Sequence, residues 1–205
     1  MGIRGSDSLS DALFSKVKQR VLAIFFNRPF ARYQLSQVIA LARSGRGAVQ
    51  RELETLLRAG ILRLATADGR KLYEVNPQSP IFEEMRGLIL KTVGLLEPLN
   101  KGLQPLSAKL DVAFVYGSVA KGEDSATSDI DLMIVARDVA YAEIYGALQK
   151  AEKKLLRPVN PTILTPGEWK QKLSQKNSFV SRISKQPKLF ITGSDDELQR
   201  IGQFG

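Results

Sequence analysis

The chain has 205 residues, with 30 lysines and arginines against 21 acidic residues and a formal net charge of +9. It contains no cysteine and no histidine, which excludes disulfides, thiolate or imidazole metal ligands, and acid–base catalysis by histidine. No apolar run reaches the length of a membrane span and the N-terminus lacks a signal-peptide core, so we expect a cytoplasmic protein of one large or two small domains.

Residues 10–78 read as a small domain of helices followed by a hairpin, and residues 1–7 are expected to be disordered. Apolar residues at helical spacing predict three helices, at 10–27, around 35–39, and from a break at 42–47 through 57. Two short apolar runs then flank Asp68-Gly69, a pair that strongly favours a tight hairpin turn.

Three stretches of this domain carry a resemblance. They are Leu35-Ser36-Gln37-Val38-Ile39, Val49-Gln50-Arg51-Glu52-Leu53 and Ala59-Gly60-Ile61-Leu62. Over about residues 12–78 the chain resembles winged helix-turn-helix transcriptional regulators of the ArsR and MarR kind. The resemblance implies binding of double-stranded DNA, with the third helix in the major groove and the hairpin tip on an adjacent backbone or groove.

Basic charge is concentrated in the same region. Residues 28–71 hold nine lysines and arginines and three acidic residues, a net charge of +6, which is typical of a nucleic-acid-binding surface. The candidate DNA-binding residues are Ser44, Arg46, Gln50 and Arg51 at the start of the third helix, and Arg70 and Lys71 at the hairpin. The alternatives are a solvated basic surface, or a winged helix that only dimerises or binds protein.

Pro77 and Pro80 mark the end of the first domain. Residues 81–100 are predicted to form a connecting helix with an unusually wide apolar surface, buried between the domains or against a second subunit. Because regulators that read paired half-sites are usually dimers, we expect a homodimer. The second domain is assigned to residues 104–205, where strand and helix patterns alternate, with a helix at 140–155 and strands at 159–164 and 189–192.

The richest chemistry lies between residues 112 and 135. A buried strand at 112–116 is followed by Gly117-Ser118, and a second strand begins at Ser128-Asp129-Ile130-Asp131. Side chains alternate along a strand, so Asp129 and Asp131 share a face, where a hard cation such as Mg²⁺ (or Mn²⁺) would relieve their repulsion. A glycine admits a ligand to the backbone, and a helix that begins at Ser118 would offer N–H groups to phosphate.

This segment resembles the DNA polymerase β nucleotidyltransferase superfamily, over about residues 108–165 and closest to its small bacterial and archaeal members. The pattern consists of Gly117-Ser118, Ala120, Gly122 and Ser128-Asp129-Ile130-Asp131. The resemblance implies a mixed sheet with flanking helices and a bound nucleoside triphosphate (NTP) with its metal. Asp129 and Asp131 would be catalytic and hold the metal, while Gly117, Ser118, Gly122 and Ser128 would bind nucleotide. The plainer interpretation is a turn followed by solvated acids.

The family uses a third carboxylate on a following strand, and Asn160 stands at the matching place. An asparagine can offer a carbonyl oxygen to a metal, so Asn160 is a further candidate ligand, but it cannot accept a proton. Glu168 is the alternative base, although it lies past the end of the strand.

The fold class expected is a two-domain α+β or α/β protein. Three functions stay open: a DNA-binding, regulator-like protein that transfers a nucleotidyl group to an unknown hydroxyl; a transcription factor whose impaired transferase domain only senses nucleotide; and a toxin–antitoxin component. We favour an active nucleotidyltransferase. The acceptor, the base of the nucleotide and the DNA operator are not specified by the sequence.

Overall fold

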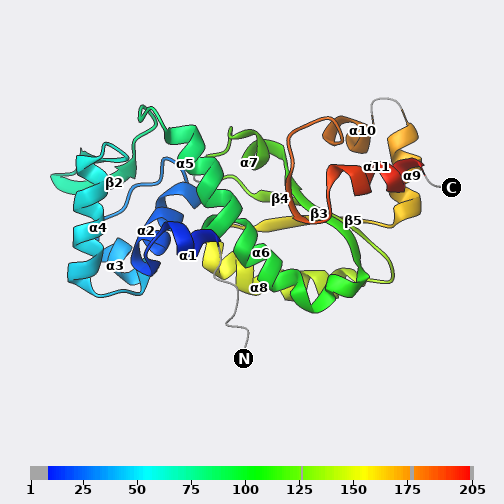
Figure 1. Ribbon diagram of the computed structural model, residues 1–205, viewed down its shortest axis with the longest axis horizontal. Helices are drawn as coiled ribbons and strands as arrows, with labels where there is room; N and C mark the ends of the chain where they lie inside the picture. Colours follow the sequence, from blue (N-terminus) through cyan, green and yellow to red (C-terminus); the bar gives the residue numbers. More distant parts are fainter. Residues whose placement is uncertain (1–8, 126, 176–177, 204–205) are drawn as a thin grey trace. The chain divides into compact units, whose positions relative to one another are not determined.

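The computed structural model describes residues 9–125, 127–175 and 178–203 (Figure 1). The chain divides into two compact units, Met1–Leu95 and Leu96–Gly205, and each is described by itself. The expectation of disorder at residues 1–7 falls outside the described residues. Within the described ranges, no helix combines the length and the apolar character needed to cross a lipid bilayer.

Four helices open the N-terminal unit: α1 Leu9–Leu13, α2 Lys16–Asn27, α3 Leu35–Ala42 and α4 Arg46–Arg58. The single first helix predicted from the sequence is divided, because the Ser15 hydroxyl accepts a hydrogen bond from the Lys18 N–H and starts α2. The helices enclose an apolar core in which α2, α3 and α4 each bury one face. Fully buried members include Val21, Leu22, Phe25, Phe26, Val38, Val49 and Leu53.

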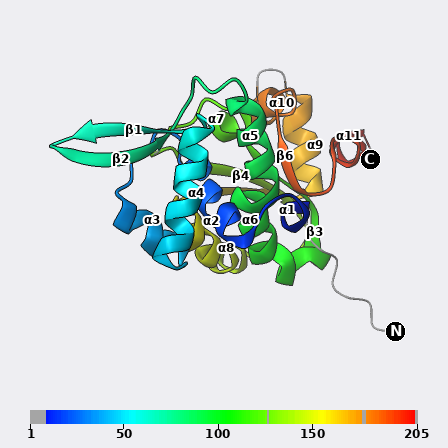
Figure 2. The same ribbon diagram turned by 60° about the vertical axis from the view of Figure 1, so that its left-hand side comes forward.

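The predicted hairpin is confirmed. Strands β1 Leu62–Ala67 and β2 Arg70–Val75 pair antiparallel, and Figure 2 shows them extending from the helices of this unit. Asp68 (φ 50°) and Gly69 (φ 70°) both have positive φ angles, the conformation of a two-residue turn that matches the twist of the strands. Tyr33 forms an isolated bridge to Tyr73, which ties the chain before α3 to the hairpin.

Glu74 changes the charge balance inferred from the sequence. Its carboxylate is buried and accepts hydrogen bonds from Arg32 Nε and Arg63 Nε, each at 2.6 Å. Burial raises the pKa of Glu74, but the two guanidinium groups outweigh it and hold that pKa below its ordinary value. Two of the nine cations counted in residues 28–71 therefore share one acid just beyond that segment, and its single negative charge lowers the net charge over residues 28–74 to +5.

The stretch predicted as one connecting helix is interrupted. It contains α5 Phe82–Ile89, the π-helical segment η1 Leu90–Gly94 and the start of α6 Leu96–Leu103. At Gly94 the chain meets α2 closely: Asn27 Nδ2 donates to the Gly94 carbonyl at 3.2 Å, and a Cβ there would collide with Asn27 Oδ1. Much of the wide apolar surface is buried within the chain. Phe82, Ile89 and Val93 join the N-terminal core, and Leu99 and Leu103 are buried on α6.

The C-terminal unit is built on a mixed four-stranded sheet, as the resemblance implied. Its strands are β3 Leu110–Tyr116, β4 Ile130–Ala136, β5 Val159–Leu164 and β6 Leu189–Thr192, in the order β5-β4-β3-β6. Only β4 and β5 are parallel, and β3 is antiparallel to both of its neighbours. The strands foreseen from the apolar runs at 112–116, 159–164 and 189–192 are confirmed.

Several helical segments follow α6 in this unit. They are η2 Gln104–Lys109, α7 Gly117–Lys121, α8 Tyr141–Leu155, α9 Pro166–Ser174, α10 Phe179–Ile183 and α11 Asp195–Gln203. One face of the sheet packs against α9, α10 and α11, whose Trp169, Val180, Ile183 and Leu198 form a cluster with Val112, Phe114, Tyr116, Met133 and Val135. Helix α6 packs against α8, whose buried face contributes nothing to that cluster. Because side chains alternate, the odd positions of β4 face α9 and α10, and Asp131 is one of them.

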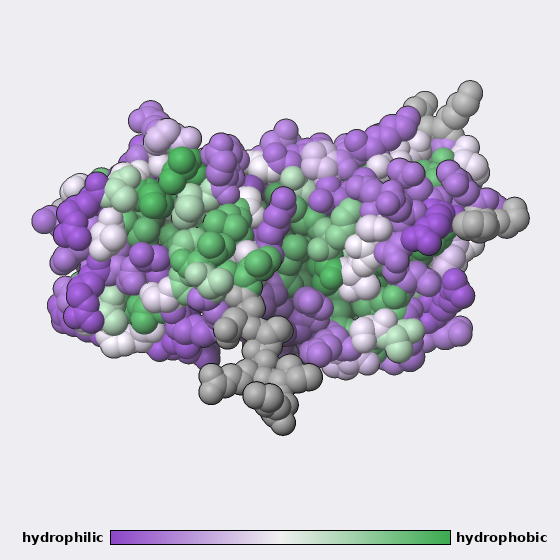
Figure 3. Space-filling model, viewed as in Figure 1, coloured by the Kyte–Doolittle hydropathy of each residue, from purple (hydrophilic) through white to green (hydrophobic). Residues whose placement is uncertain are grey.

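Apolar side chains also reach the surface of the N-terminal unit. In Figure 3 green residues gather over part of this unit, and its exposed large apolar side chains include Leu9 and Leu13 of α1 and Ile81 before α5.

Candidate active site

Three adjacent strands bring the predicted catalytic residues to one edge of the sheet. In the strand register Asp131 pairs with Tyr116 of β3 on one side and with Asn160 of β5 on the other. Since β3 runs opposite to β4 and β5, its last residue lies beside their first residues. The turn into Gly117, the acid pair and Asn160 therefore meet, although they are far apart in the sequence.

Gly117 and Asp131 are in direct contact. Gly117 has φ +73°, a conformation that favours glycine, and a Cβ built on it would lie 2.5 Å from Asp131 Oδ2. Both the backbone conformation and the lack of space require glycine here. The chain passes at once into α7, so Ser118 lies in the first turn of a short helix beside the Asp131 carboxylate.

The two acids stand in different surroundings. Asp131 is partly buried in β4, while Asp129 is exposed one residue before that strand begins. Burial, together with the nearby charge of Asp129, raises the pKa of Asp131. The pair is therefore poised to take up a proton or a cation, either of which relieves the repulsion.

Asn160 reaches the acid pair as a hydrogen-bond donor. Its Nδ2 donates to Asp129 Oδ2 at 3.0 Å. The position matched to a third carboxylate is thus occupied by a neutral amide that supports one of the two acids. Asn160 lies where the sequence predicted it, next to the candidate metal ligands, and its side chain carries no negative charge.

Gly122 and Ser128 shape the loop between α7 and β4. Gly122 (φ +82°) ends α7 and donates its N–H to the Val119 carbonyl at 3.3 Å. The Ser128 hydroxyl accepts a hydrogen bond from the Ser125 N–H at 2.8 Å. Both residues predicted to bind nucleotide hold the loop that leads to Asp129.

A buried ion pair, absent from the sequence reasoning, fastens this loop. Arg157 Nη1 lies 2.8 Å from Asp124 Oδ2, with side-chain exposures of 3% and 0%. Arg157 also donates through Nε to the Ser128 carbonyl at 2.7 Å and through Nη2 to the Asp129 carbonyl at 3.4 Å. One guanidinium thus fixes the backbone on which Asp129 is carried. The only signals in the sequence were an acid beside Glu123 in a polar loop and an arginine before Pro158, and neither indicates its partner.

Glu168 is not the substitute base, and that suggestion is wrong. Strand β5 runs from Asn160, beside Asp131, to Leu164, beside Val135, so Glu168 lies beyond the opposite end of the sheet. There it caps α9: its Oε2 accepts hydrogen bonds from the Thr165 N–H at 2.7 Å and the Thr165 hydroxyl at 2.9 Å. The backbone hydrogen bond from Thr165 is the main reason that the pKa of Glu168 is lowered.

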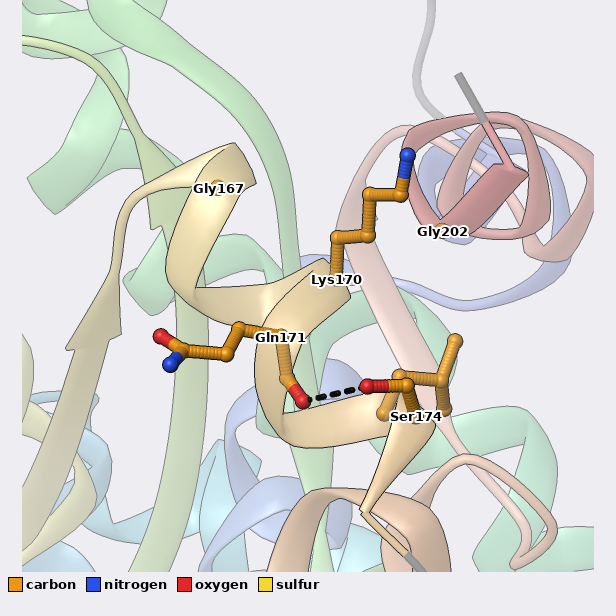
Figure 4. Close-up of a pocket in the computed structure, with 6 residues that line it drawn as sticks. Gly167, Lys170, Gln171, Ser174 and Gly202 are labelled. Atoms are coloured by element: carbon orange, nitrogen blue, oxygen red, sulfur yellow. Dashed lines mark hydrogen bonds between the residues drawn. The ribbon is translucent and has the colours of Figure 1, made fainter. Parts of the chain in front are cut away.

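Hollows beside α9 and α11 of the C-terminal unit lie away from the acid pair. Figure 4 shows one of about 420 Å³ between α9 and α11, where the Ser174 hydroxyl donates to the Gln171 carbonyl at 2.8 Å. It is lined by Gly167, Lys170, Gln171, Leu173, Ser174 and Gly202. Because it follows the far end of β5, it takes no part in the candidate site, which is an open sheet edge.

The predicted DNA-binding residues belong to the N-terminal unit. Arg46, the first residue of α4, and Arg51 one turn later are exposed, and Gln50 is partly exposed. Ser44 is already engaged, because its hydroxyl donates to the Ala42 carbonyl at 3.0 Å and accepts from Arg20 Nη1 at 3.2 Å. Arg70 and Lys71 are exposed and follow the hairpin turn directly.

The donor set at the sheet edge suits a magnesium ion. Mg²⁺ is commonly held by one or two carboxylates, with phosphate and water oxygens completing its coordination. Asp129 and Asp131 provide two carboxylates with unrelieved repulsion, and Gly117 leaves the space that the Asp131 carboxylate fills. In the described ranges no three acidic, cysteine or histidine side chains gather into a larger metal-binding group.

Comparison with known proteins gives one family match and one structural match. No curated protein sequence is detectably similar to the chain. A crystal structure of a toxin–antitoxin with AMP-PNP matches at 18% identity and a TM-score of 0.38, covering 53% of this chain and 81% of that chain. Residues 101–191 match the family model for polymerase beta, nucleotidyltransferase. That range includes the whole segment whose resemblance was inferred from its motif, so residues 101–191 carry a nucleotidyltransferase domain of the polymerase beta family.

Proposed function

We propose that the chain is a DNA-binding, regulator-like protein whose C-terminal domain binds Mg–NTP and transfers a nucleotidyl group to an acceptor hydroxyl. The observation that carries the enzymatic part is the meeting of Asp129, Asp131 and Gly117 at one sheet edge, within a nucleotidyltransferase domain. Nucleotidyltransferase domains generally use a divalent metal and an NTP.

Each residue at the edge has a role in this proposal. Asp129 and Asp131 hold Mg²⁺ (or Mn²⁺), which when bound neutralises the phosphates and polarises the phosphoryl group under attack. Ser118 and the backbone after Gly117 face the triphosphate with hydroxyl and N–H donors. Arg157 and Asp124 hold the loop so that Asp129 stays within reach of the same ion as Asp131.

The first test replaces Asp131 with asparagine. In the absence of metal, Asp131→Asn is expected to raise the melting temperature at neutral pH, because it removes a partly buried charge next to Asp129. Mg–NTP should raise the melting temperature of the wild type and leave that of the variant unchanged, since only a protein that binds the ligand is stabilised by it. Differential scanning calorimetry measures both effects.

The pH dependence of this effect has a definite sign. The pKa of Asp131 is raised in the folded state, so the folded chain binds more protons than the unfolded chain between the ordinary and the raised value. Wild-type stability therefore falls as pH rises through that interval, and the advantage of Asp131→Asn should vanish below it. Glu123→Gln, which neutralises an exposed acid of the same loop, is the control and should have little effect. If the melting temperature of Asp131→Asn still rises on addition of Mg–NTP, the proposed metal site is contradicted.

A second function, nucleotide sensing without transfer, is favoured by Asn160. Its amide donates to Asp129 instead of supplying a third anionic ligand. With two carboxylates the domain retains the means to bind a metal–triphosphate complex, but it has no evident base for the acceptor hydroxyl. A transcription factor that reads nucleotide levels would need binding only.

The DNA-binding part of the proposal is supported by the N-terminal unit. Three consecutive helices, α2, α3 and α4, precede a two-stranded hairpin, and the start of α4 and the hairpin tip carry exposed cations. This order of elements suits a helix in the major groove with a wing beside it. The exposed apolar surface around α1 is consistent with a homodimer that reads paired half-sites.

Exposed arginines on α4 provide the test. Arg46→Ala and Arg51→Ala in the full-length chain are each expected to weaken binding to a selected duplex by about 1–3 kcal/mol if they contact bases. Binding should also weaken steeply as salt rises, because the protein displaces counterions from phosphate. Fluorescence anisotropy across a salt series measures both. Arg58→Ala, in the last turn of the same helix, is the matched control, and equal losses for all three variants would rule out a specific contact by the start of α4.

A further inference from the structure

We propose that Phe179, supported by Tyr116, forms the surface on which the base of the bound nucleotide stacks. This inference rests on the proposed binding of Mg–NTP at Asp129 and Asp131. It adds a subsite for the nucleobase to a site that so far has ligands only for metal and phosphate.

Tyr116 links the acid pair to its surroundings. It is the last residue of β3, immediately before Gly117, and it pairs across the sheet with Asp131. Its hydroxyl lies 3.3 Å from the Thr162 hydroxyl of β5, and its pKa is raised mainly by burial, with a further contribution from the Asp131 charge. The Tyr116 ring is therefore a fixed, mostly buried floor on the sheet face to which Asp131 points.

The Phe179 ring packs against the Tyr116 ring and is partly exposed to solvent. It is the first residue of α10, and its ring centre lies 5.6 Å from that of Tyr116 at an interplanar angle of 70°. The residues that anchor α10 are its neighbours Val180 and Ile183, which are buried in the core. Phe179 is not itself a member of that core, and 43% of it is exposed.

The chemistry of this surface matches a nucleobase. An aromatic ring stacks with any of the four bases, because every base has a π-face, so such a contact depends little on base identity. Phe179 has no polar atom, and the Tyr116 hydroxyl is engaged with Thr162. The surface would therefore give affinity with little discrimination among the four bases, apart from a preference for larger purine rings.

The C-terminal unit provides a matched control for an exposed aromatic residue. Tyr141 lies on α8, is 58% exposed, and stacks on Tyr145 with ring centres 6.1 Å apart. Helix α8 contributes nothing to the cluster that contains Tyr116. Removing Tyr141 thus deletes a comparable exposed ring at a place without the acid pair.

The experiment separates the base from the phosphates. Isothermal titration of the full-length chain would use Mg²⁺ with ATP, GTP, CTP or UTP and, in parallel, Mg²⁺ with inorganic tripolyphosphate. Phe179→Ala and Phe179→Leu are expected to weaken NTP binding on the order of 5- to 150-fold and to leave tripolyphosphate binding unchanged. Phe179→Tyr should restore wild-type affinity, and Tyr141→Ala should retain it.

The outcomes distinguish the two proposals. If the wild type binds neither NTP nor tripolyphosphate, the proposed function fails and the stacking surface fails with it. If the wild type binds NTP and both Phe179 variants bind it equally well, the stacking surface alone is overturned. A parallel loss of tripolyphosphate affinity in Phe179→Leu, which keeps an apolar side chain against Tyr116, would also overturn it by showing that Phe179 only maintains the shape of the site.

Discussion

Replacing Arg157 with alanine is expected to lower the free energy of unfolding of the C-terminal unit by about 3–5 kcal/mol. The guanidinium is buried beside Asp124, so its removal takes away a charged partner of the buried Asp124 carboxylate and the donor to the Ser128 and Asp129 carbonyls. Chemical denaturation followed by circular dichroism measures the loss. The loop that carries Asp129 should loosen with it, and the affinity for Mg–NTP should fall.

Two controls show whether burial is the cause. Arg137 Nε lies 3.3 Å from Asp111 Oδ2 and the Arg137 side chain is 71% exposed, so Arg137→Ala should lower the free energy of unfolding by less than Arg157→Ala does. The double replacement Arg157→Met with Asp124→Leu should be less destabilising than Arg157→Ala, because it removes both buried charges together. If Arg157→Ala and Arg137→Ala lower the free energy of unfolding equally, the Arg157–Asp124 pair does not fasten the loop.

Asn160→Asp is expected to increase the rate of pyrophosphate release with Mg²⁺ or Mn²⁺ by about 10²–10⁴-fold, the range that a general base contributes. The change restores an anionic oxygen and a proton acceptor on β5, directly beside Asp131. It also replaces a donor to Asp129 with a third negative charge, so the metal-free variant should be less stable than the wild type. A coupled pyrophosphate assay with total cell extract as acceptor measures the rate.

Asn160→Ala is the control, because it removes the hydrogen bond to Asp129 without adding a carboxylate. It should bind Mg–NTP and release pyrophosphate no faster than the wild type. If the wild type already turns over rapidly and Asn160→Asp is equal or slower, then Asn160 does not stand in for a third acid. Nucleotide sensing would then lose its main support.

Much of the C-terminal unit could be predicted because its two central strands, β3 and β4, are nearly continuous apolar runs. A buried strand appears in the sequence as a run of apolar residues. The two acids at the start of β4 interrupt that run, and the alternation of side chains along a strand explains why they share one face. The turn at Asp68-Gly69 could also be predicted, since few residue pairs accept two positive φ angles. In each case the determining interactions lie within a few residues along the chain.

The failures involve partners that are distant in sequence. Arg157 and Asp124 are 33 positions apart, and Glu74 binds Arg32 across 42. No local sequence pattern indicates such pairs. The buried Arg157–Asp124 ion pair was therefore missed, and the free basic charge of residues 28–71 was overestimated. Glu168 was misjudged for a related reason: its distance from Asn160 along the chain is short, but the intervening strand carries it to the opposite end of the sheet.

The contact between Gly117 and Asp131 constrains how this protein can evolve. Every substitution at position 117 adds a carbon where the Asp131 carboxylate already lies, and also demands a backbone conformation that other residues resist. A smaller residue at 131 would create room but remove the charge. Neither position can drift alone while the site is under selection. In a lineage that abandoned nucleotide binding, the two would be released together, so their joint divergence would record the loss of function.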